Sequence, residues 1–333
     1  MATSFNWAKR SRNSLLCLIA LGLAASMGCN SSSDHSHPLT ASIDHKFSGE
    51  LPLKILCTTG QIAEAVEQIA GEHAEVTALM GPGVDPHLYR AVPADVALLQ
   101  SADIVFYNGL HLEGRIVETL EQLGKKKPVV AVAARLEEQK DDRLRTPPEF
   151  EGLHDPHVWH DALLWADCTD YAAERLAAFD SDRATDYSAN SKAYRDKLEA
   201  LDQWCRDEIA TIPEERRVLV TAHDAFGYFS NEYGLKAVGL KGISTEDEVD
   251  FQHMDEVIKL LVEHKIPAVF VESSTAPRIV EALIEPCQKQ GHDVSIGGEL
   301  YADALGSADS GADTYEGMIR ANVQTIVAGL NGE

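Results

Sequence analysis

The chain has 333 residues, of which 44% are hydrophobic and 25% are charged, and its formal net charge is −24. This length suits two domains of ordinary size, and this composition is typical of a chain that folds in water rather than of a disordered or membrane-embedded one. The strong negative charge argues against nucleic acid as a partner and is compatible with a cationic ligand.

The amino terminus predicts an export signal. Three basic residues precede an apolar run over residues 15–25, and this run is too short to span a bilayer comfortably. The run ends in Ser-Met-Gly followed by Cys29, which resembles the lipobox of bacterial lipoproteins, although Ser and Met stand where that pattern usually has Leu and a small residue. The resemblance implies removal of residues 1–28, a lipid on Cys29 and a periplasmic or other extracytoplasmic location. The polar residues 29–50 predict a flexible tether.

From residue 53 onward, short apolar runs alternate with amphipathic stretches, a pattern that predicts parallel strands and covering helices. The predicted strands span residues 53–58, 75–79, 104–107, 129–132, 218–221, 236–240, 268–271 and 294–296. The predicted helices span residues 62–69, 93–99, 116–123, 225–233, 251–264, 277–289 and 315–330. We therefore expect an α/β fold with two lobes, each a four-stranded parallel sheet flanked by helices.

A long segment without Gly or Pro separates the two halves of this pattern. Over residues 184–212 the apolar side chains recur at helical spacings, which predicts one helix roughly 43 Å long, and Pro213 should end it. Such a helix is a stiff link that resists large hinge closure. It divides the chain into an amino-terminal lobe over residues 51–183, the linking helix, and a carboxy-terminal lobe over residues 213–333.

The six cysteines form no CxxC pair. Two of them belong to the export signal and its end, and the other four, Cys57, Cys168, Cys205 and Cys287, are spread far apart. An exported protein could form disulfides among these four, but their spacing defines no framework, and it does not favour a zinc-thiolate cluster.

Three of the thirteen histidines lie in loops where strands are predicted to end. His87 and His157 each complete the tripeptide Asp-Pro-His, and His223 follows the first strand of the second half. Ligands of open parallel sheets bind outside the carboxyl ends of the strands, so these loops are expected to face a common cleft. The Pro stiffens the backbone that presents each imidazole, and the Asp before it could accept the second ring N–H. This arrangement favours a metal site.

A fourth donor is expected from the loop that follows the last strand. Asp303 is the candidate, with Glu299 as its competitor. Three neutral imidazoles and one carboxylate would leave a divalent ion with a net site charge of about +1, and such a donor set suits zinc, and less strongly manganese or iron, rather than calcium or magnesium.

Other histidines lie close to these candidates. His154 and His160 form an H-x-x-H-x-x-H run with His157, but only one position of such a loop needs to face the cleft. We therefore expect His154 and His160 at the surface, and we expect His111 in a polar role at the start of a helix.

Several segments together resemble the zinc/manganese group of periplasmic metal-binding proteins, the family with a rigid linking helix. The segments are GPGVDPHLY at 81–89, YNGLHLEG at 107–114, DPHVW at 155–159, AHDAFGYF at 222–229, ISTE at 243–246, VESS at 271–274 and LYADALG at 300–306. The resemblance runs from about residue 53 to residue 330, and its motifs are specific in combination.

The resemblance implies a function and a ligand set. Such a protein captures Zn²⁺ or Mn²⁺ as a transported ligand and delivers it to an ABC permease in the inner membrane, and we expect it to act as a monomer and not as an enzyme. Carried over by position, the ligands are His87, His157, His223 and Asp303. Members dedicated to manganese often have Glu as the third ligand, so His223 places this chain with the variants linked to zinc or to both metals.

The chain departs from this family in two places. Many zinc-specialised relatives have a long His-rich acidic insertion before the second metal histidine. The corresponding segment here, residues 135–154, is short and contains one His. Arg90 stands where relatives often have Glu, which we interpret as a surface change.

Two other functions remain as alternatives. Three histidines can hold a catalytic zinc with water in the fourth position, as in a zinc-dependent hydrolase. Asp303 would close that position, however, and the sequence has no HExxH-type helix, nucleophile elbow or phosphate-binding glycine loop. The second alternative is a surface adhesin lipoprotein stabilised by its metal, and the rate of metal exchange would distinguish it.

Overall fold

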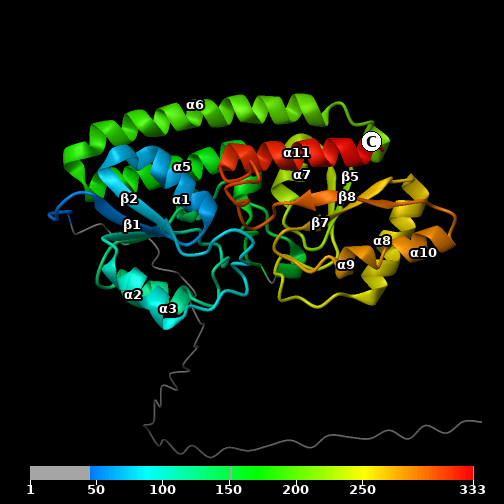
Figure 1. The fold of residues 1–333 in the computed structure, drawn as a ribbon, viewed down its shortest axis with the longest axis horizontal. Helices are drawn as coiled ribbons and strands as arrows, with labels where there is room; N and C mark the ends of the chain where they lie inside the picture. The colour runs from blue at the N-terminus through cyan, green and yellow to red at the C-terminus, as the bar shows by residue number, and fades with distance from the viewer. Residues whose placement is uncertain (1–45, 151, 333) are drawn as a thin grey trace, which may run out of the picture. The chain divides into compact units, whose positions relative to one another are not determined.

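The computed structural model describes residues 46–150 and 152–332 (Figure 1). The predicted signal peptide, Cys29 and most of the predicted tether lie outside these residues. At the start of the described chain, the Phe47 amide donates to the Phe179 carbonyl at 2.7 Å, and the two ring centroids lie 5.8 Å apart. The folded body therefore already includes Phe47, which lies before the predicted boundary at residue 51.

The first four strands form one parallel sheet, as predicted. They are β1 (Leu53–Cys57), β2 (Ala74–Ala78), β3 (Ile104–Tyr107) and β4 (Val129–Ala131), in the spatial order β2-β1-β3-β4. In the central strand β1, Ile55 pairs with Val76 on one side and with Ile104 on the other. Strands β1, β3 and β4 are almost wholly buried, which is typical of parallel strands covered on both faces.

Four helices accompany these strands in the amino-terminal half, by which we mean the described residues before residue 184. They are α1 (Gly60–Ala70), α2 (Pro93–Ser101), α3 (Val117–Gly124) and α4 (Ala134–Gln139). Helix α1 buries Ile62, Val66 and Ile69 on one face, in the spacing that its sequence predicts. Helix α4 was not predicted.

The four predicted strands of the carboxy-terminal half, residues 213–332, are also present. They are β5 (Val218–Thr221), β6 (Lys236–Gly239), β7 (Ala268–Glu272) and β8 (Ser295–Leu300). They pair in parallel as two two-stranded sheets, β5-β6 and β7-β8, rather than as the single four-stranded sheet expected, and β5 lies in contact with β7. Just beyond the end of β5, the His223 amide donates at 3.0 Å to the side chain of Glu272, the last residue of β7. A side chain thus joins the two pairs at the edge where the candidate ligands lie.

The helices of this half are α7 (Gly227–Tyr233), α8 (Phe251–His264), α9 (Arg278–Glu281), α10 (Ile284–Lys289) and α11 (Tyr315–Asn331). The single helix predicted over residues 277–289 is wrong, because the structure divides it into α9 and α10. Pro286 accounts for the break: it has no N–H to donate to the preceding turn, so it is tolerated only within the first turn of a new helix.

The long helix predicted between the halves is α6 (Ala184–Ile209), which has 26 residues and a length of about 39 Å. It ends three residues before the predicted residue 212. Helices α5 (Ala162–Phe179), α1 and α11 pack against it, so it contacts elements from both halves (Figure 1). Its buried side chains include Tyr187, Tyr194, Leu198 and Leu201.

Helix α5 was not predicted, and it follows directly from the His157 segment. Asp161 caps its first turn by accepting hydrogen bonds from the amides of Leu163 and Leu164, both at 2.9 Å. Helix α5 packs against α6, and this packing anchors the segment that carries His157.

Within the described residues, no helix is both long and apolar enough to cross a membrane. The sequence left open whether the four cysteines after residue 50 form disulfides. In the structure they do not: Cys57, Cys168, Cys205 and Cys287 are all buried and free.

Candidate metal centre

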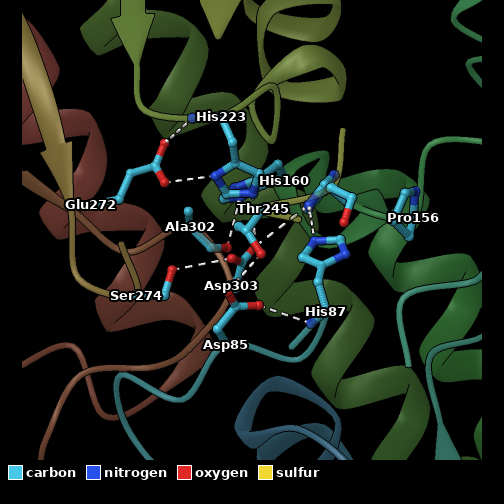
Figure 2. Close-up of polar contacts among 12 residues, drawn as sticks. Asp85, His87, Pro156, His160, His223, Thr245, Glu272, Ser274, Ala302 and Asp303 are labelled. Atoms are coloured by element: carbon cyan, nitrogen blue, oxygen red, sulfur yellow. Dashed lines mark hydrogen bonds and ion pairs between the residues drawn. The ribbon is translucent and has the colours of Figure 1, made fainter. Parts of the chain in front are cut away.

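The structure brings the four predicted ligands together at one point. His87 lies in the loop after β2, His157 precedes α5, His223 follows β5, and Asp303 follows β8. Their candidate ligand atoms all lie within 4.8 Å of one another, and all four side chains are buried. Figure 2 shows His87, His223 and Asp303 pointing toward a common centre. Residues from both halves of the chain therefore make one cluster.

The distances within this cluster suit a bound cation. Nε2 of His87 lies 3.2 Å from Nε2 of His157, and Oδ1 of Asp303 lies 3.5 Å from Nε2 of His157 and 3.3 Å from Nε2 of His223. Despite that proximity, Nε2 of His223 and Oδ1 of Asp303 make no hydrogen bond of acceptable geometry although both atoms are buried. Unsatisfied buried polar atoms are costly, and a cation among these lone pairs would satisfy them together.

His157 receives the ring contact that its Asp-Pro-His segment predicted. Asp155 accepts a hydrogen bond from Nδ1 of His157 at 2.8 Å and another from its backbone amide at 3.0 Å, both on Oδ1. The other carboxylate oxygen of Asp155 pairs with Arg145. A proton fixed on Nδ1 leaves the lone pair of Nε2 free to face the cluster, which is the tautomer a metal ligand needs.

His223 is oriented by Glu272, a residue that the sequence reasoning did not identify as part of the site. Oε2 of Glu272 lies 2.6 Å from Nδ1 of His223, and Oε1 accepts the His223 amide at 3.0 Å. Glu272 is the last residue of the buried strand β7, and a carboxylate at the end of such a strand was the signal that could have revealed it.

The Asp-Pro-His segment at residues 85–87 behaves differently. The prediction that Asp85 accepts the second ring N–H of His87 is wrong. Oδ1 of Asp85 accepts the backbone amides of His87 and Leu88, at 2.9 and 3.3 Å, rather than the His87 ring. Oδ2 of Asp85 accepts the hydroxyl of Thr245 at 2.6 Å. Since both oxygens are engaged in this way, Asp85 fixes the backbone that carries His87 and contacts the carboxy-terminal half.

Asp303 is also oriented by its neighbours. Ser274 donates to its Oδ2 at 3.1 Å, and the carbonyl of Ala302, the preceding residue, accepts from Nε1 of Trp159 at 2.9 Å. Glu299, the competing candidate, is exposed on β8 and is not part of the cluster. Glu246, a further carboxylate from a motif of the second half, is exposed and pairs with Arg115.

The expectation that His160 lies at the surface is wrong. His160 is buried, its Nε2 lies 3.0 Å from the Ala302 carbonyl, and its ring centroid lies 4.4 Å from that of Phe226. Contacts with the other half bury this side chain, and the local sequence carries no sign of them. His154 is partly buried beside Thr146, and neither His154 nor His160 belongs to the cluster. His111 adopts a positive φ of 66° in the loop before α3.

The surroundings change the pKa values of these candidate ligands. Burial lowers the pKa of His87 to about 3. Burial also favours the neutral forms of His157 and His223, but nearby carboxylates outweigh it and raise both pKa values, that of His223 well above its usual range. For Asp303, burial opposes ionisation, and the surrounding imidazoles outweigh it and keep the pKa of the carboxyl well below its usual range. Protons and metal therefore compete for the same nitrogens.

The charges around the cluster also favour a cation. Asp303, Asp155 and Glu272 contact the ring nitrogens, and Arg145 pairs with Asp155. Asp85 also lies beside the cluster and Asp224 beside Arg145, so carboxylates outnumber the cationic side chain there, and this excess of negative charge favours a bound cation. Three imidazole nitrogens and one carboxylate oxygen form a donor set for zinc and its transition-metal neighbours, while calcium and magnesium require mostly oxygen.

Comparisons with known proteins agree with this geometry. Residues 55–329 match the protein family described as "Zinc-uptake complex component A periplasmic". The manganese-binding lipoprotein MntA of Bacillus subtilis (strain 168) is 45% identical over 284 residues, which cover 85% of this chain and 91% of that protein. The zinc-binding protein TroA of Treponema pallidum (strain Nichols) is 42% identical over 276 residues, 83% of this chain and 88% of TroA. The solved structure of the periplasmic zinc-binding protein TroA from Treponema pallidum superimposes with a TM-score of 0.79 at 42% identity and covers 84% of this chain and 99% of that one.

Proposed function

The chain belongs to the family of the periplasmic zinc-uptake complex component A, and from this premise we propose that it captures a divalent transition metal outside the cytoplasm and delivers it to an ABC permease. The observation that carries the proposal is the buried cluster of three imidazoles and one carboxylate, in which two polar atoms have no hydrogen-bond partner. The ligands are His87, His157 and His223, each through Nε2, and Asp303 through Oδ1.

The metal is zinc, manganese or both. The relatives do not select between these ions, because MntA is described as manganese-binding and TroA as zinc-binding. Ligand chemistry favours zinc at equilibrium, since nitrogen-rich sites follow the usual order of divalent ions, in which zinc binds more tightly than manganese.

We further propose how the protein is arranged in the cell. Lipidation at Cys29 attaches it to the membrane through residues 29–50, and it meets an inner-membrane permease as a monomer. Residues 51–183 and 213–333 act as two lobes, and the linking helix, predicted over residues 184–212, limits their relative motion. Two observations support this arrangement. The similar protein MntA is described as a lipoprotein, and α6 packs against helices of both halves.

A binding role fits this site better than catalysis. A hydrolase that uses zinc needs an open coordination position for water, and Asp303 faces the position that water would occupy. A metal with a purely structural role would resist removal, whereas a transported ion must leave the protein without unfolding it.

Competitive titration tests the proposal. Metal-free protein is titrated with zinc and manganese against a chromophoric chelator, and its folding is followed by circular dichroism. We expect one equivalent of metal, tighter binding of zinc, and full release under mild chelation with the fold intact. Absence of binding, displacement of zinc by equimolar manganese, or unfolding on release would contradict the proposal. The metal content of the protein purified from its own envelope then identifies the physiological ion.

A further inference from the structure

Thr245 contacts Asp85, which supports the His87 backbone, rather than any of the four proposed metal ligands. It lies in the carboxy-terminal half, only 4% of its surface is exposed, and its hydroxyl donates to Oδ2 of Asp85 in the amino-terminal half at 2.6 Å (Figure 2). We propose that Thr245 is a positioning residue for metal binding, which fixes His87 relative to His223 through Asp85. This inference rests on the proposed function.

The first step links Asp85 to His87. One oxygen of Asp85 accepts the backbone amides of His87 and Leu88, at 2.9 and 3.3 Å. This contact fixes the backbone from which the imidazole projects, whereas the ring of His157 is fixed directly by a carboxylate on its Nδ1. The orientation of His87 therefore depends on where Asp85 lies, and Asp85 depends on Thr245.

The second step links Thr245 to His223. The segment that precedes Thr245 is hydrogen-bonded to the backbone on both sides of His223: the Lys241 amide donates to the Ala222 carbonyl at 3.0 Å, and the Asp224 amide donates to the Gly242 carbonyl at 3.0 Å. A displacement of the His223 loop should therefore move the segment that carries Thr245.

Two further contacts fix Thr245 on this segment. The ammonium group of Lys241 donates to the Thr245 carbonyl at 2.6 Å. The Asp247 amide donates to the Ser244 carbonyl at 3.1 Å, which closes a tight turn around Thr245. The hydroxyl thus occupies a defined position relative to His223, and a continuous series of contacts joins two ligands that come from opposite halves of the chain.

A neighbouring contact provides a matched control. Glu246, the next residue, also contacts the other half, through an ion pair with Arg115, but both side chains are substantially exposed and neither contacts Asp85 or His87 in the described structure. Exposed ion pairs contribute little to stability. If any contact between the halves were sufficient to position His87, Glu246→Gln and Thr245→Val would have similar effects on zinc release.

The test compares full-length Thr245→Val, Thr245→Ser and Glu246→Gln with the wild type. Zinc release to excess chelator is followed by stopped flow, and the visible spectrum of Co²⁺-loaded protein reports the ligand set. Loss of an outer-shell partner usually weakens metal binding about 10-fold to 100-fold, so we expect Thr245→Val to release zinc about tenfold faster and to alter the Co²⁺ spectrum toward that of His87→Ala. Thr245→Ser, which keeps the hydroxyl, and Glu246→Gln should both behave like the wild type.

A double-mutant cycle shows whether Thr245 acts through His87. In the His87→Ala background, Thr245→Val should have little further effect on zinc release, because the ligand that it positions is gone. Release at the wild-type rate by Thr245→Val, or an effect that persists in full without His87, would overturn the inference while leaving the proposed function intact. Failure of the wild-type protein to bind zinc or manganese would instead overturn the proposed function, and the inference with it.

Discussion

Residues 85–87 and 155–157 have the same sequence, Asp-Pro-His, yet the structure uses them in different ways. Asp155 contacts the ring of its own histidine at 2.8 Å, while Asp85 contacts only the backbone of His87 and divides its carboxylate between that backbone and Thr245. The ring of His157 is fixed directly by its own segment, whereas the aspartate that fixes the His87 backbone is itself held by a residue from the opposite half of the chain. A short motif can therefore identify a ligand without determining how that ligand is oriented.

The packing around the two segments explains the difference. Around His157, the side chains of Tyr228 and Asn108 donate to the backbone carbonyls of Asp155 and Pro156 at 2.8 and 3.0 Å. These contacts come from both halves, and α5 follows the segment closely in the chain. The His87 segment lies in the loop between β2 and α2, and Leu88 beside it is 44% exposed. The more open segment is the one that needs an external contact.

The largest expected effect comes from removing each histidine in turn. His157→Ala should weaken zinc binding more than His87→Ala, since it removes a nitrogen donor and also leaves the buried Asp155 without its ring partner. Both losses, and that of His223→Ala, should exceed the roughly 100-fold upper range for outer-shell partners. Asp303→Asn keeps an oxygen donor and should cost less. Chelator competition measures all four affinities, and equal losses for His87→Ala and His157→Ala would show that the two segments are equivalent.

The next effect comes from the two aspartates. Asp155→Asn should weaken zinc binding by about 10-fold to 100-fold, because the acceptor on Nδ1 of His157 loses its charge and an amide NH2 replaces the oxygen that pairs with Arg145. Asp85→Asn should have a smaller effect, since an amide oxygen can still accept the backbone N–H groups of His87 and Leu88. The same competition assay compares them. A larger loss for Asp85→Asn would reverse our ranking of the two segments.

The pH dependence of binding sharpens the comparison further. In the metal-free protein the pKa values of His157 and His223 are raised, so zinc affinity should fall as the pH drops through those raised values, where protons occupy the nitrogens that the metal needs. His87, with its pKa lowered to about 3 by burial, stays neutral over this range and should not contribute to the fall.

The two aspartate variants provide the check on this pH dependence. Asp155→Asn should shift the fall in zinc affinity to lower pH, because the carboxylate that favours the charged form of His157 is lost. Asp85→Asn should leave the contribution of His157 unchanged. Zinc titrations between about pH 5 and about pH 8 test both variants. No shift for Asp155→Asn would mean that Asp155 does not influence the proton on His157.

The smallest effect is expected at His154, three residues before His157 in the same loop. Its side chain contacts Thr146 rather than the cluster. His154→Ala should therefore leave zinc affinity and stoichiometry unchanged in the chelator assay. A measurable loss would show that the histidine run of this loop, and not the Asp-Pro-His tripeptide alone, contributes to metal binding.

Much of the fold could be predicted because the signals are local. Apolar runs bounded by turn residues identified all eight strands, and the long segment without Gly or Pro identified α6. Helix α5 was missed because 11 of its 18 residues are buried between α6, α1 and neighbouring segments, which leaves too weak an amphipathic pattern to recognise.

The site shows the same limit. The four ligands could be proposed from loop position, residue type and the family resemblance, and the structure places them together. Glu272 and Thr245, which orient His223 and His87, were not assigned, because each contacts its partner across a sequence separation of 49 or more residues; for Glu272 the only signal was its place at the end of a buried strand. For the same reason His160 was placed at the surface, although side chains of the opposite half cover it.

The four free cysteines have a consequence for how the protein reaches its folded state. In the oxidising compartment proposed for this chain, thiolates would react, but burial raises the pKa of the Cys57 and Cys287 thiols and raises that of Cys205 to about 12. The native fold thus protects its own thiols from oxidation. A newly exported chain has no such protection, so folding must bury the cysteines before oxidants join them in disulfides. Variants that fold slowly should therefore accumulate as species with non-native disulfides rather than as reduced, unfolded chains.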